Sequence, residues 1–447
     1  MTIPFLLSRA CNHDGLRKYG ANTLWLFAEK AVRMALGLTV GVYIARQLGP
    51  AQYGLLNYAI SFVAIFSVVI SLGLDAIVVR ELVRQPQRRM QILGSALGLE
   101  GIGYLLMLCG VGVGLHFSDN DRTTNLLILV IAAGYLFQVL QPIDYFFQAE
   151  VKSKYIAVTQ MAAWILVSAG RAFCAWRGYP LIYFAGLEAA NIALQGLGYA
   201  ICYQLTSGNL LHWRFEPATA RRLFKDSWML LLSGMIGIVY MRIDQVMIKA
   251  MLGDAAVGYY AAAVRLSELW YFVPTLVCTS LFPAIIRAKT VSQAHYERRL
   301  QMLYNLLASF SLLLAVAVML FGSQVVTLLY GEAYSPAIGI LNIYIWSVMT
   351  IALTSALGRW MLVENLQLIL MLAGAVGVMV NIGLNYLFIR RYGLNGAALA
   401  TIISPLCNLA VIFICNKPSR SQFRCIIKAI FLVWVIRLLK TFPEIRR

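Results

Sequence analysis

The sequence predicts an all-α membrane protein, and three observations support this fold class. Hydrophobic residues make up 60% of the 447 positions and charged residues only 13%, about half the charged share of a soluble domain. Apolar stretches of roughly 20 residues, enough for a helix to cross the bilayer, recur along the whole chain. The sequence lacks the ten-residue segments of alternating polarity that indicate membrane β-strands.

The apolar stretches predict about twelve membrane spans. The expected ranges are 21–45, 53–75, 91–115, 124–146, 156–176, 180–206, 227–249, 256–286, 300–321, 336–358, 365–389 and 393–416. The stretches 180–206 and 256–286 are long, so we expect them to be tilted or to extend past the bilayer.

Lys and Arg are unevenly distributed between the connections. With the N-terminus in the cytoplasm, the cytoplasmic segments hold 26 of the 37 basic residues, and the opposite side holds 7. Cytoplasmic loops of membrane proteins are rich in Lys and Arg, so this bias predicts that both termini are cytoplasmic. The same rule accounts for the net charge of +18, and we therefore expect no nucleic-acid partner.

The longest internal cytoplasmic connection divides the chain into two halves of six spans. The expected parts are an N-terminal lobe at 1–206, a linker at 207–226, a C-terminal lobe at 227–416 and a basic cytoplasmic tail at 417–447. Within the tail, Cys425–Leu439 is apolar but short and contains Lys428 and Arg437. This composition favours an amphipathic helix in the plane of the interface, and insertion of the segment into the bilayer stays open.

The two halves contain a short internal repeat. Leu48–Ala59 aligns with Leu252–Ala263 at an offset of 204, and each segment joins the first two spans of its half. Gly49 and Gly253 suit the left-handed backbone that ends a helix. Because both copies lie on one side of the membrane, the repeat predicts two lobes related by a pseudo-twofold axis along the membrane normal. The alternative is a pair of ordinary turns.

Charged side chains within the spans are concentrated near the start of each half. A charge at the centre of a span costs at least about 2.5–3.5 kcal/mol, so such groups need partners or water. The arrangement predicts a polar cavity between the halves. The charged residues are Glu29, Lys30 and Arg33 in the first span, Asp75 in the second, Arg242 and Asp244 in the seventh, and Arg265 and Glu268 in the eighth.

The spacing of these residues predicts ion pairs. Glu29 and Arg33 are four residues apart on one helix face, and Arg265 and Glu268 are three apart. Arginine also suits a phosphate ligand, because its planar guanidinium donates two parallel bonds and keeps its charge when desolvated. The alternative is that the cations form internal salt bridges that fix helix packing. The candidate anion-binding residues are Arg33, Arg242, Arg265 and Lys30.

No motif of a known enzyme class occurs in the sequence. The phosphate-binding pattern GxxxxGK[ST] is absent, and no residues have the spacing of a catalytic triad or a zinc site. We therefore expect no catalytic residues, no bound metal and no cofactor.

Six stretches, in order along the chain, resemble the Wzx-type polysaccharide flippases of the multidrug/oligosaccharidyl-lipid/polysaccharide exporter superfamily. The ordered set is specific to the family but not to a substrate. The stretches are Ile44–Ala59, Gly73–Leu82, Met241–Leu266, Leu281–Ala288, Tyr330–Leu341 and Asn381–Thr401.

This resemblance implies two six-helix lobes in a V around a central cavity. It implies alternating access that moves an undecaprenyl-pyrophosphate-linked oligosaccharide to the periplasmic leaflet, for the synthesis of O-antigen, capsule or exopolysaccharide. Arg33, Arg242, Asp244 and Arg265 would then line the lumen, with its cations at the pyrophosphate. The residues implied for coupling to a proton or sodium gradient are Asp244, Glu29 and Glu268.

The same resemblance implies a location and partners. A flippase of this family would lie in the bacterial inner membrane, in contact with its lipids and with the lipid-linked oligosaccharide. A polysaccharide polymerase and a chain-length regulator are further expected partners.

Two alternative functions remain open. A multidrug extruder of the same superfamily needs a net acidic cavity, whereas the first, seventh and eighth spans together hold four cations and three acids. A membrane polysaccharide polymerase or ligase needs a large outer catalytic loop, whereas the outer connections have at most about 15 residues.

Overall fold

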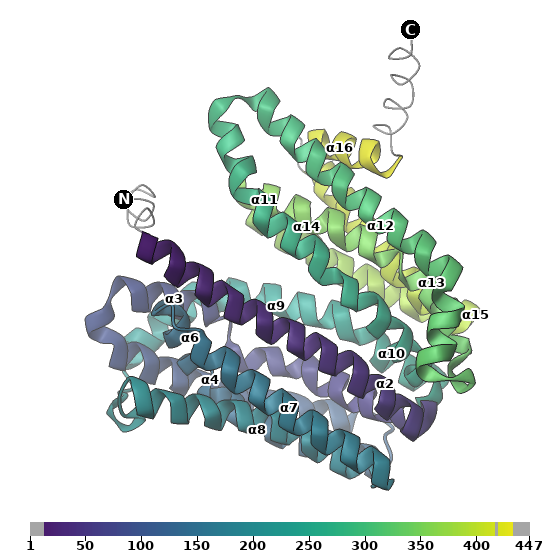
Figure 1. Cartoon of the computed structure of the whole chain (residues 1–447), viewed down its shortest axis with the longest axis horizontal. Helices are drawn as coiled ribbons and strands as arrows, with labels where there is room; N and C mark the ends of the chain where they lie inside the picture. Colours follow the sequence, from purple (N-terminus) through teal and green to yellow (C-terminus); the bar gives the residue numbers. More distant parts are fainter. Residues whose placement is uncertain (1–12, 416–418, 432–447) are drawn as a thin grey trace. The chain divides into compact units, whose positions relative to one another are not determined.

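The computed structural model describes residues 13–415 and 419–431, and within these ranges the chain is helical and contains no strand (Figure 1). The all-α prediction is therefore confirmed. Contacts between residues divide the chain into two compact units. Unit 1 comprises Met1–Leu48 and Leu55–Ile238, and unit 2 comprises Gly49–Gly54 and Val239–Arg447.

Nine helical segments of the described residues are long and apolar enough to cross a membrane. Two of them each contain two predicted spans, separated by a glycine with a positive φ. These glycines are Gly49 in α2 (His13–Ser71) and Gly393 in α15 (Gln367–Cys415). The remaining predicted span, 180–206, is α8 (Leu181–Thr206), a continuous helix of 26 residues that is not among the nine.

Unit 1 is built around α8, which packs against α5, α7 and the 3₁₀ helix η2. A cluster of buried apolar side chains from α3, α4, α6 and α8 forms its core. Besides α2 and α8, its elements are α3 (Asp75–Arg84), η1 (Pro86–Arg88), α4 (Arg89–His116), α5 (Arg122–Gly134), η2 (Tyr135–Leu140), α6 (Pro142–Ala149), α7 (Lys154–Arg177), η3 (Leu210–His212) and the first part of α9 (Pro217–Leu252).

The predicted span 124–146 is interrupted by η2, between α5 and α6. Pro142 explains the interruption, because proline has no backbone N–H to bond to the carbonyl four residues earlier, on Gln138. That carbonyl accepts instead from the backbone N–H of Gln141, at 2.9 Å. The chain thus tightens into a helix of about three residues per turn, in which every third side chain lies on the same face.

Unit 2 has its largest apolar core between α11, α12, α14 and α15. As in unit 1, a 3₁₀ helix lies next to a proline. This helix, η4, ends one turn before Pro274, which has no backbone N–H to donate to the carbonyl of Trp270. Besides α15 and the second part of α9, its elements are α10 (Asp254–Glu268), η4 (Leu269–Tyr271), α11 (Phe272–Val291), α12 (Gln293–Tyr330), η5 (Glu332–Tyr334), α13 (Pro336–Tyr344), α14 (Ser347–Val363) and α16 (Arg420–Ile430).

The division between the units falls inside α9, after Ile238. We expected the linker at 207–226, but α9 already begins at Pro217 and continues without a break to Leu252. Ion pairs tie its first turns to unit 1. Arg222 lies 3.5 Å from Glu81 of α3, and Asp226 pairs with Arg80 of the same helix.

Both copies of the repeat have the predicted left-handed glycine. Gly49 has a φ of 71° and Gly253 a φ of 85°. At each site the helix ends and the next one begins immediately, with Pro50 or Asp254 as its first residue. The expectation for these glycines is confirmed, because their conformation depends only on the local turn.

The two copies of the repeat also touch each other within unit 2. A Cβ on Gly54 would collide with the carbonyl oxygen of Asp254, and a Cβ on Gly258 would collide with the carbonyl oxygen of Pro50. Gly258 lies 204 residues after Gly54, and Asp254 lies 204 after Pro50. The contact is therefore reciprocal, as in an interface with twofold symmetry.

The tail contains a helix that starts before the predicted segment. α16 spans Arg420–Ile430, buries Ile426 and Ala429, and packs against α12 and α15. The rest of the predicted segment, residues 432–439, lies outside the described residues, so an in-plane orientation stays a prediction.

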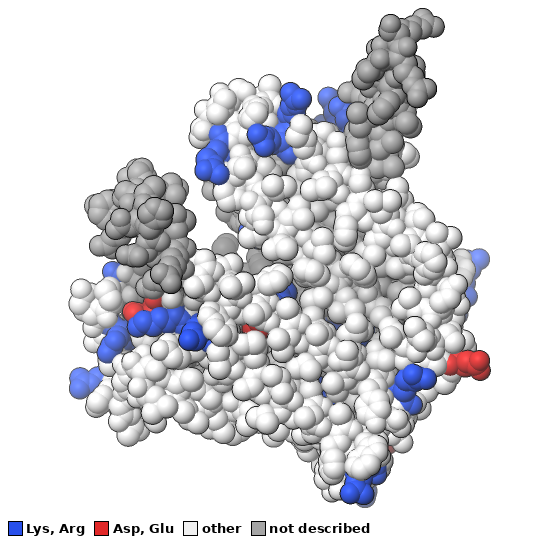
Figure 2. Space-filling model, in the orientation of Figure 1, with Lys and Arg blue, Asp and Glu red and all other residues white. Residues whose placement is uncertain are grey.

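Charge is concentrated at helix ends on the face that Figure 2 shows. Lys and Arg gather over the turn between α11 and α12 and over α16, while most of the visible surface between such clusters is uncharged. Such a distribution is typical of a protein whose helices cross a bilayer. The basic residues of this region include Lys289, Arg298, Arg299, Arg420 and Arg424.

Candidate substrate pocket and charged clusters

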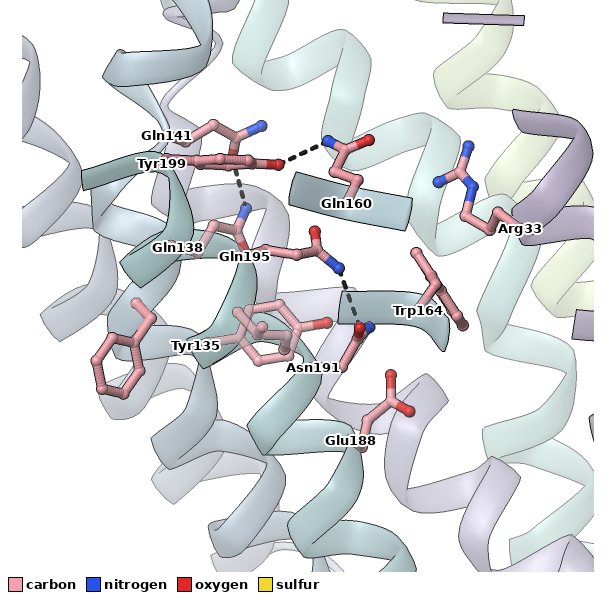
Figure 3. A pocket seen from close by; sticks show the side chains of 13 residues that line it. Arg33, Tyr135, Gln138, Gln141, Gln160, Trp164, Glu188, Asn191, Gln195 and Tyr199 are labelled. Atoms are coloured by element: carbon pink, nitrogen blue, oxygen red, sulfur yellow. Dashed lines mark hydrogen bonds between the residues drawn. The ribbon is translucent and has the colours of Figure 1, made fainter. Parts of the chain in front are cut away.

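Unit 1 contains a pocket of about 270 Å³, lined by 13 residues from α2, η2, α7 and α8 (Figure 3). Five of the lining side chains are amides and four are aromatic. Nine of the 13 lining side chains are therefore uncharged amides or aromatic rings. The amides are Gln138, Gln141, Gln160, Asn191 and Gln195, and the aromatic residues are Tyr135, Phe137, Trp164 and Tyr199.

One face of α8 forms a wall of the pocket. Glu188, Asn191, Gln195 and Tyr199 follow each other at intervals of three or four residues, which places them on one side of a helix. The amide of Gln195 donates to the Asn191 side-chain oxygen at 3.2 Å. Asn191 and Tyr199 are buried, so this polar face is directed into the unit.

The opposite walls come from η2 and α7. The 3₁₀ geometry of η2 aligns Tyr135, Gln138 and Gln141, which are spaced by three residues. The Gln138 amide donates to the Gln141 side-chain oxygen at 3.2 Å. On α7, the Gln160 amide donates to the Tyr199 hydroxyl at 2.6 Å. These bonds, drawn in Figure 3, hold the amides in place.

Two glycines let the walls approach each other closely. A Cβ on Gly196 of α8 would collide with the Phe137 carbonyl oxygen of η2. A Cβ on Gly134 would lie 2.5 Å from the Cα of Ala189. Side chains at these positions would push η2 and α8 apart and change the spacing of the amides on the two elements.

Arg33 is the cation on the pocket lining. Its side chain extends from α2 toward the amides (Figure 3), is about half exposed, and forms an ion pair with the buried Glu29 through Nε, at 3.2 Å. The predicted pairing of Glu29 with Arg33 is thus confirmed. Lys30 is exposed and is not part of the lining, although its charge also acts on Glu29.

The acid of the pocket also has a partner. Glu188 of α8 forms an ion pair with Arg171 of α7. Both charged side chains on the lining are therefore compensated by a neighbouring charge.

A second charged cluster lies in unit 2. The charges of Arg242 and Arg265 both act on Glu268, which is partly buried. Arg265 also donates to the Tyr53 hydroxyl at 3.4 Å. The structure thus brings three predicted site residues together within this unit. Arg33 belongs to the other unit, so its convergence with Arg242 and Arg265 stays a prediction.

Asp244 lies in a buried polar network of unit 2. Its carboxylate accepts hydrogen bonds from the Tyr260 hydroxyl at 2.8 Å, the Thr401 hydroxyl at 2.8 Å and the Asn385 amide at 2.7 Å. The Asn385 amide also donates to the Asn381 side-chain oxygen at 3.0 Å. The charge of Asp244 is therefore stabilised by neutral donors from α10 and α15. The described residues contain no group of three or more His, Cys, Asp or Glu side chains that could hold a metal ion.

Comparison with known proteins identifies the family. A family model described as polysaccharide biosynthesis protein matches residues 19–289, which is more than half of the chain. The chain belongs to the polysaccharide biosynthesis protein family. The match includes the pocket of unit 1 and the cluster of Arg242, Asp244, Arg265 and Glu268.

Two relatives of this family member are similar over most of its length. The probable low-salt glycan biosynthesis flippase Agl15 of Haloferax volcanii is 21% identical over 379 residues, which cover 83% of this chain and 76% of that protein. The putative O-antigen transporter of Shigella flexneri is 21% identical over 412 residues, which cover 85% and 93%.

Solved structures of two kinds of transporter share the fold of this chain. The lipid II flippase MurJ, in an inward closed conformation, superposes with a TM-score of 0.69 at 16% identity, over 93% of each chain. A multidrug resistance transporter of the MATE family, in an inward-facing conformation, has a TM-score of 0.67 at 14% identity, over 88% of this chain and 94% of its own. The predicted exporter fold is thus confirmed, and the fold alone does not choose between these two kinds of transporter.

The amides of the pocket are not among the candidate residues that we predicted from the sequence. A signal for one wall is present, because Glu188, Asn191, Gln195 and Tyr199 form a polar stripe within the apolar stretch 180–206. The residues from η2 carry no such signal, because their alignment depends on the 3₁₀ geometry.

Proposed function

We propose that the protein is a flippase that moves an undecaprenyl-pyrophosphate-linked oligosaccharide from the cytoplasmic to the periplasmic leaflet by alternating access. The observation that carries the proposal is the pocket of unit 1, which presents amides, aromatic rings and Arg33 within a bundle of apolar helices. Membership of the polysaccharide biosynthesis protein family and similarity to a glycan biosynthesis flippase support it.

In this proposal the protein catalyses no reaction and lies in the inner membrane with both termini in the cytoplasm. It receives its substrate from glycosyl transfer on the cytoplasmic side. On the periplasmic side it delivers the substrate to a polymerase, whose products a chain-length regulator controls.

The cations of the two units would bind the pyrophosphate. Arg242 and Arg265 both act on Glu268, and the charge of Asp244 acts on it as well, so two cations and two acids lie close together in unit 2. Guanidinium groups donate bidentate bonds to phosphate oxygens, and a diphosphate offers several such oxygens. We assign the same role to Arg33 and Lys30 in unit 1.

Asp244 is our first candidate for coupling to a proton or sodium gradient. It is a buried carboxylate held by neutral donors instead of a cation, so a proton or a sodium ion would add the missing positive charge. Glu29 and Glu268 are further candidates, but each already has arginine nearby.

The first test removes the cations of unit 2. We expect Arg242→Ala and Arg265→Ala to abolish surface polysaccharide in cells that lack their own copy of this flippase. Lys at either position restores part of the export, because it keeps the charge but loses the bidentate geometry. Surface polysaccharide is measured by gel electrophoresis, and protein insertion by blotting the membrane fraction. Arg390→Ala is the matched control, because Arg390 is exposed and lies over the ring of Tyr386.

Normal polysaccharide in both alanine variants would overturn the assignment of the cations. A wild-type protein that exports cationic drugs and leaves lipid-linked oligosaccharide on the cytoplasmic leaflet would instead be a multidrug extruder.

A further inference from the structure

We infer that the pocket of unit 1 binds one uncharged sugar ring, namely the sugar that is bonded to the pyrophosphate, and that Arg33 binds the phosphate on that sugar. The inference rests on the proposed function and adds to it which part of the substrate unit 1 recognises. It uses residues of unit 1 alone: Arg33, Gln138, Gln160, Trp164, Asn191 and Gln195.

The charges on the lining indicate a neutral occupant for the pocket itself. Glu188 is paired with Arg171, so it offers no uncompensated negative charge to a cationic drug. The remaining polar groups of the lining are amides and tyrosine hydroxyls. A cationic ligand would lose its hydration in such a pocket and gain no uncompensated negative charge in return.

The amides match the chemistry of sugar hydroxyls. A hydroxyl both donates and accepts hydrogen bonds, and a side-chain amide offers two donors and an acceptor within one group. The bonds from Gln195 to Asn191, and from Gln160 to Tyr199, use only part of this capacity. They fix the amides without exhausting them, and such preorganisation strengthens binding.

Trp164 supplies the apolar surface that a sugar ring also needs. It lies one turn from Gln160 on α7 and lines the same pocket. A pyranose presents C–H groups on its faces and hydroxyls around its edge, so a flat aromatic ring can cover a face while amides bond the edge.

The size of the pocket selects a single ring. Its volume of about 270 Å³ lies just below the range of small-molecule pockets, roughly 300–1,000 Å³. A whole oligosaccharide would not fit, so the other sugars and the lipid must lie outside the pocket.

Arg33 determines which ring occupies the pocket. Its Nε faces Glu29, and its two Nη groups have no hydrogen-bond partner within the described part of the chain. A phosphate at these groups would be bonded directly to a sugar in the pocket. The first sugar of a lipid-linked oligosaccharide is the one that carries the pyrophosphate.

The test measures binding to the full-length protein in lipid nanodiscs. The probes are undecaprenyl pyrophosphate and its single-sugar derivatives with glucose, galactose or N-acetylglucosamine. We expect at least one sugar to raise the affinity of the wild-type protein roughly tenfold over the bare lipid. We expect Trp164→Ala and Asn191→Ala to abolish that gain. Arg33→Ala weakens binding of all the lipids.

Controls separate loss of the pocket from loss of folding. Trp176→Ala changes the same residue type on the same helix, and Trp176 is 68% exposed and outside the lining, so we expect the sugar-dependent gain to remain. Trp164→Phe keeps an aromatic ring and retains part of the gain. The thermal unfolding midpoint of each variant shows that it is folded.

The inference is overturned if no sugar raises the affinity, or if the gain survives in both Trp164→Ala and Asn191→Ala. Binding of the bare lipid in those experiments would leave the proposed function intact. A wild-type protein that binds none of the lipids would instead contradict the proposed function itself.

Discussion

Asp244 illustrates how a single side chain acquires its surroundings from distant residues. Its donors, Tyr260, Asn385 and Thr401, come from α10 and from both halves of α15. In the sequence, Asp244 is an isolated acid within an apolar stretch. In the structure, each carboxylate oxygen has a hydrogen-bond donor, so the charge can persist in a buried position.

Replacement of Asp244 by alanine should destabilise unit 2. The donors on Tyr260 and Thr401 would lose an acceptor, and an unsatisfied buried polar group costs about 1–3 kcal/mol. We expect a lower thermal unfolding midpoint in detergent, measured by the fluorescence of tryptophan. Asp119→Ala is the control, because Asp119 is exposed.

The isosteric variant Asp244→Asn separates stability from coupling. It keeps the size of the side chain, so we expect it to fold while transport becomes independent of the ion gradient. Gradient-dependent transport at the wild-type rate in this variant would exclude Asp244 as the coupling residue.

At the scale of elements, the pocket depends on an irregular helix. η2 aligns Tyr135, Gln138 and Gln141 because it has about three residues per turn, whereas an α-helix would turn them progressively away from one another. Pro142 causes this irregularity by removing one backbone donor. A sequence pattern read with the period of an α-helix therefore misplaces these side chains.

The reciprocal contact of the repeat gives a prediction at the same scale. Gly54→Ala and Gly258→Ala each place a Cβ against backbone atoms that cannot rotate away, and such overpacking costs about 1–3 kcal/mol. We expect both variants to lower the unfolding midpoint by similar amounts, because the contacts are equivalent. The measurement is thermal unfolding of the purified protein.

Gly112→Ala is the matched control for these two variants. No atom lies within 4 Å of a Cβ at this helical position, and alanine favours a helix more than glycine does. Wild-type stability in the Gly54 and Gly258 variants would show that this contact is loose in solution.

At the scale of the whole molecule, the distribution of Lys and Arg predicts the orientation in the membrane. Of the 37 basic residues, 26 lie in segments that we place in the cytoplasm. We expect green fluorescent protein to fluoresce when it is fused at the C-terminus or inserted at 207–209. Alkaline phosphatase inserted at 119–121 should be active, because that connection is predicted to be periplasmic.

The opposite pattern of reporter activity would reverse the orientation and leave the helical fold unchanged. Activity of phosphatase inserted at both sites would mean that an even number of spans, and not the predicted three, lies between them, and would remove one span from the first half. The span that this experiment tests most directly is α8, because its polar face lowers its hydropathy.

Features that depend on neighbouring residues could be predicted from the sequence. It predicted the helical class, the ranges of the spans, the pairing of Glu29 with Arg33 and the left-handed glycines Gly49 and Gly253. Each of these follows from local backbone geometry or from the period of a helix.

Which polar side chains meet depends on how distant parts of the chain fold together. Asn385 and Asp244 are 141 residues apart, and Thr401 and Asp244 are 157 apart. The amides of the pocket come from three separate elements in the same way. No local pattern specifies such contacts, because they depend on how whole helices pack, and packing reflects the shapes of many side chains at once.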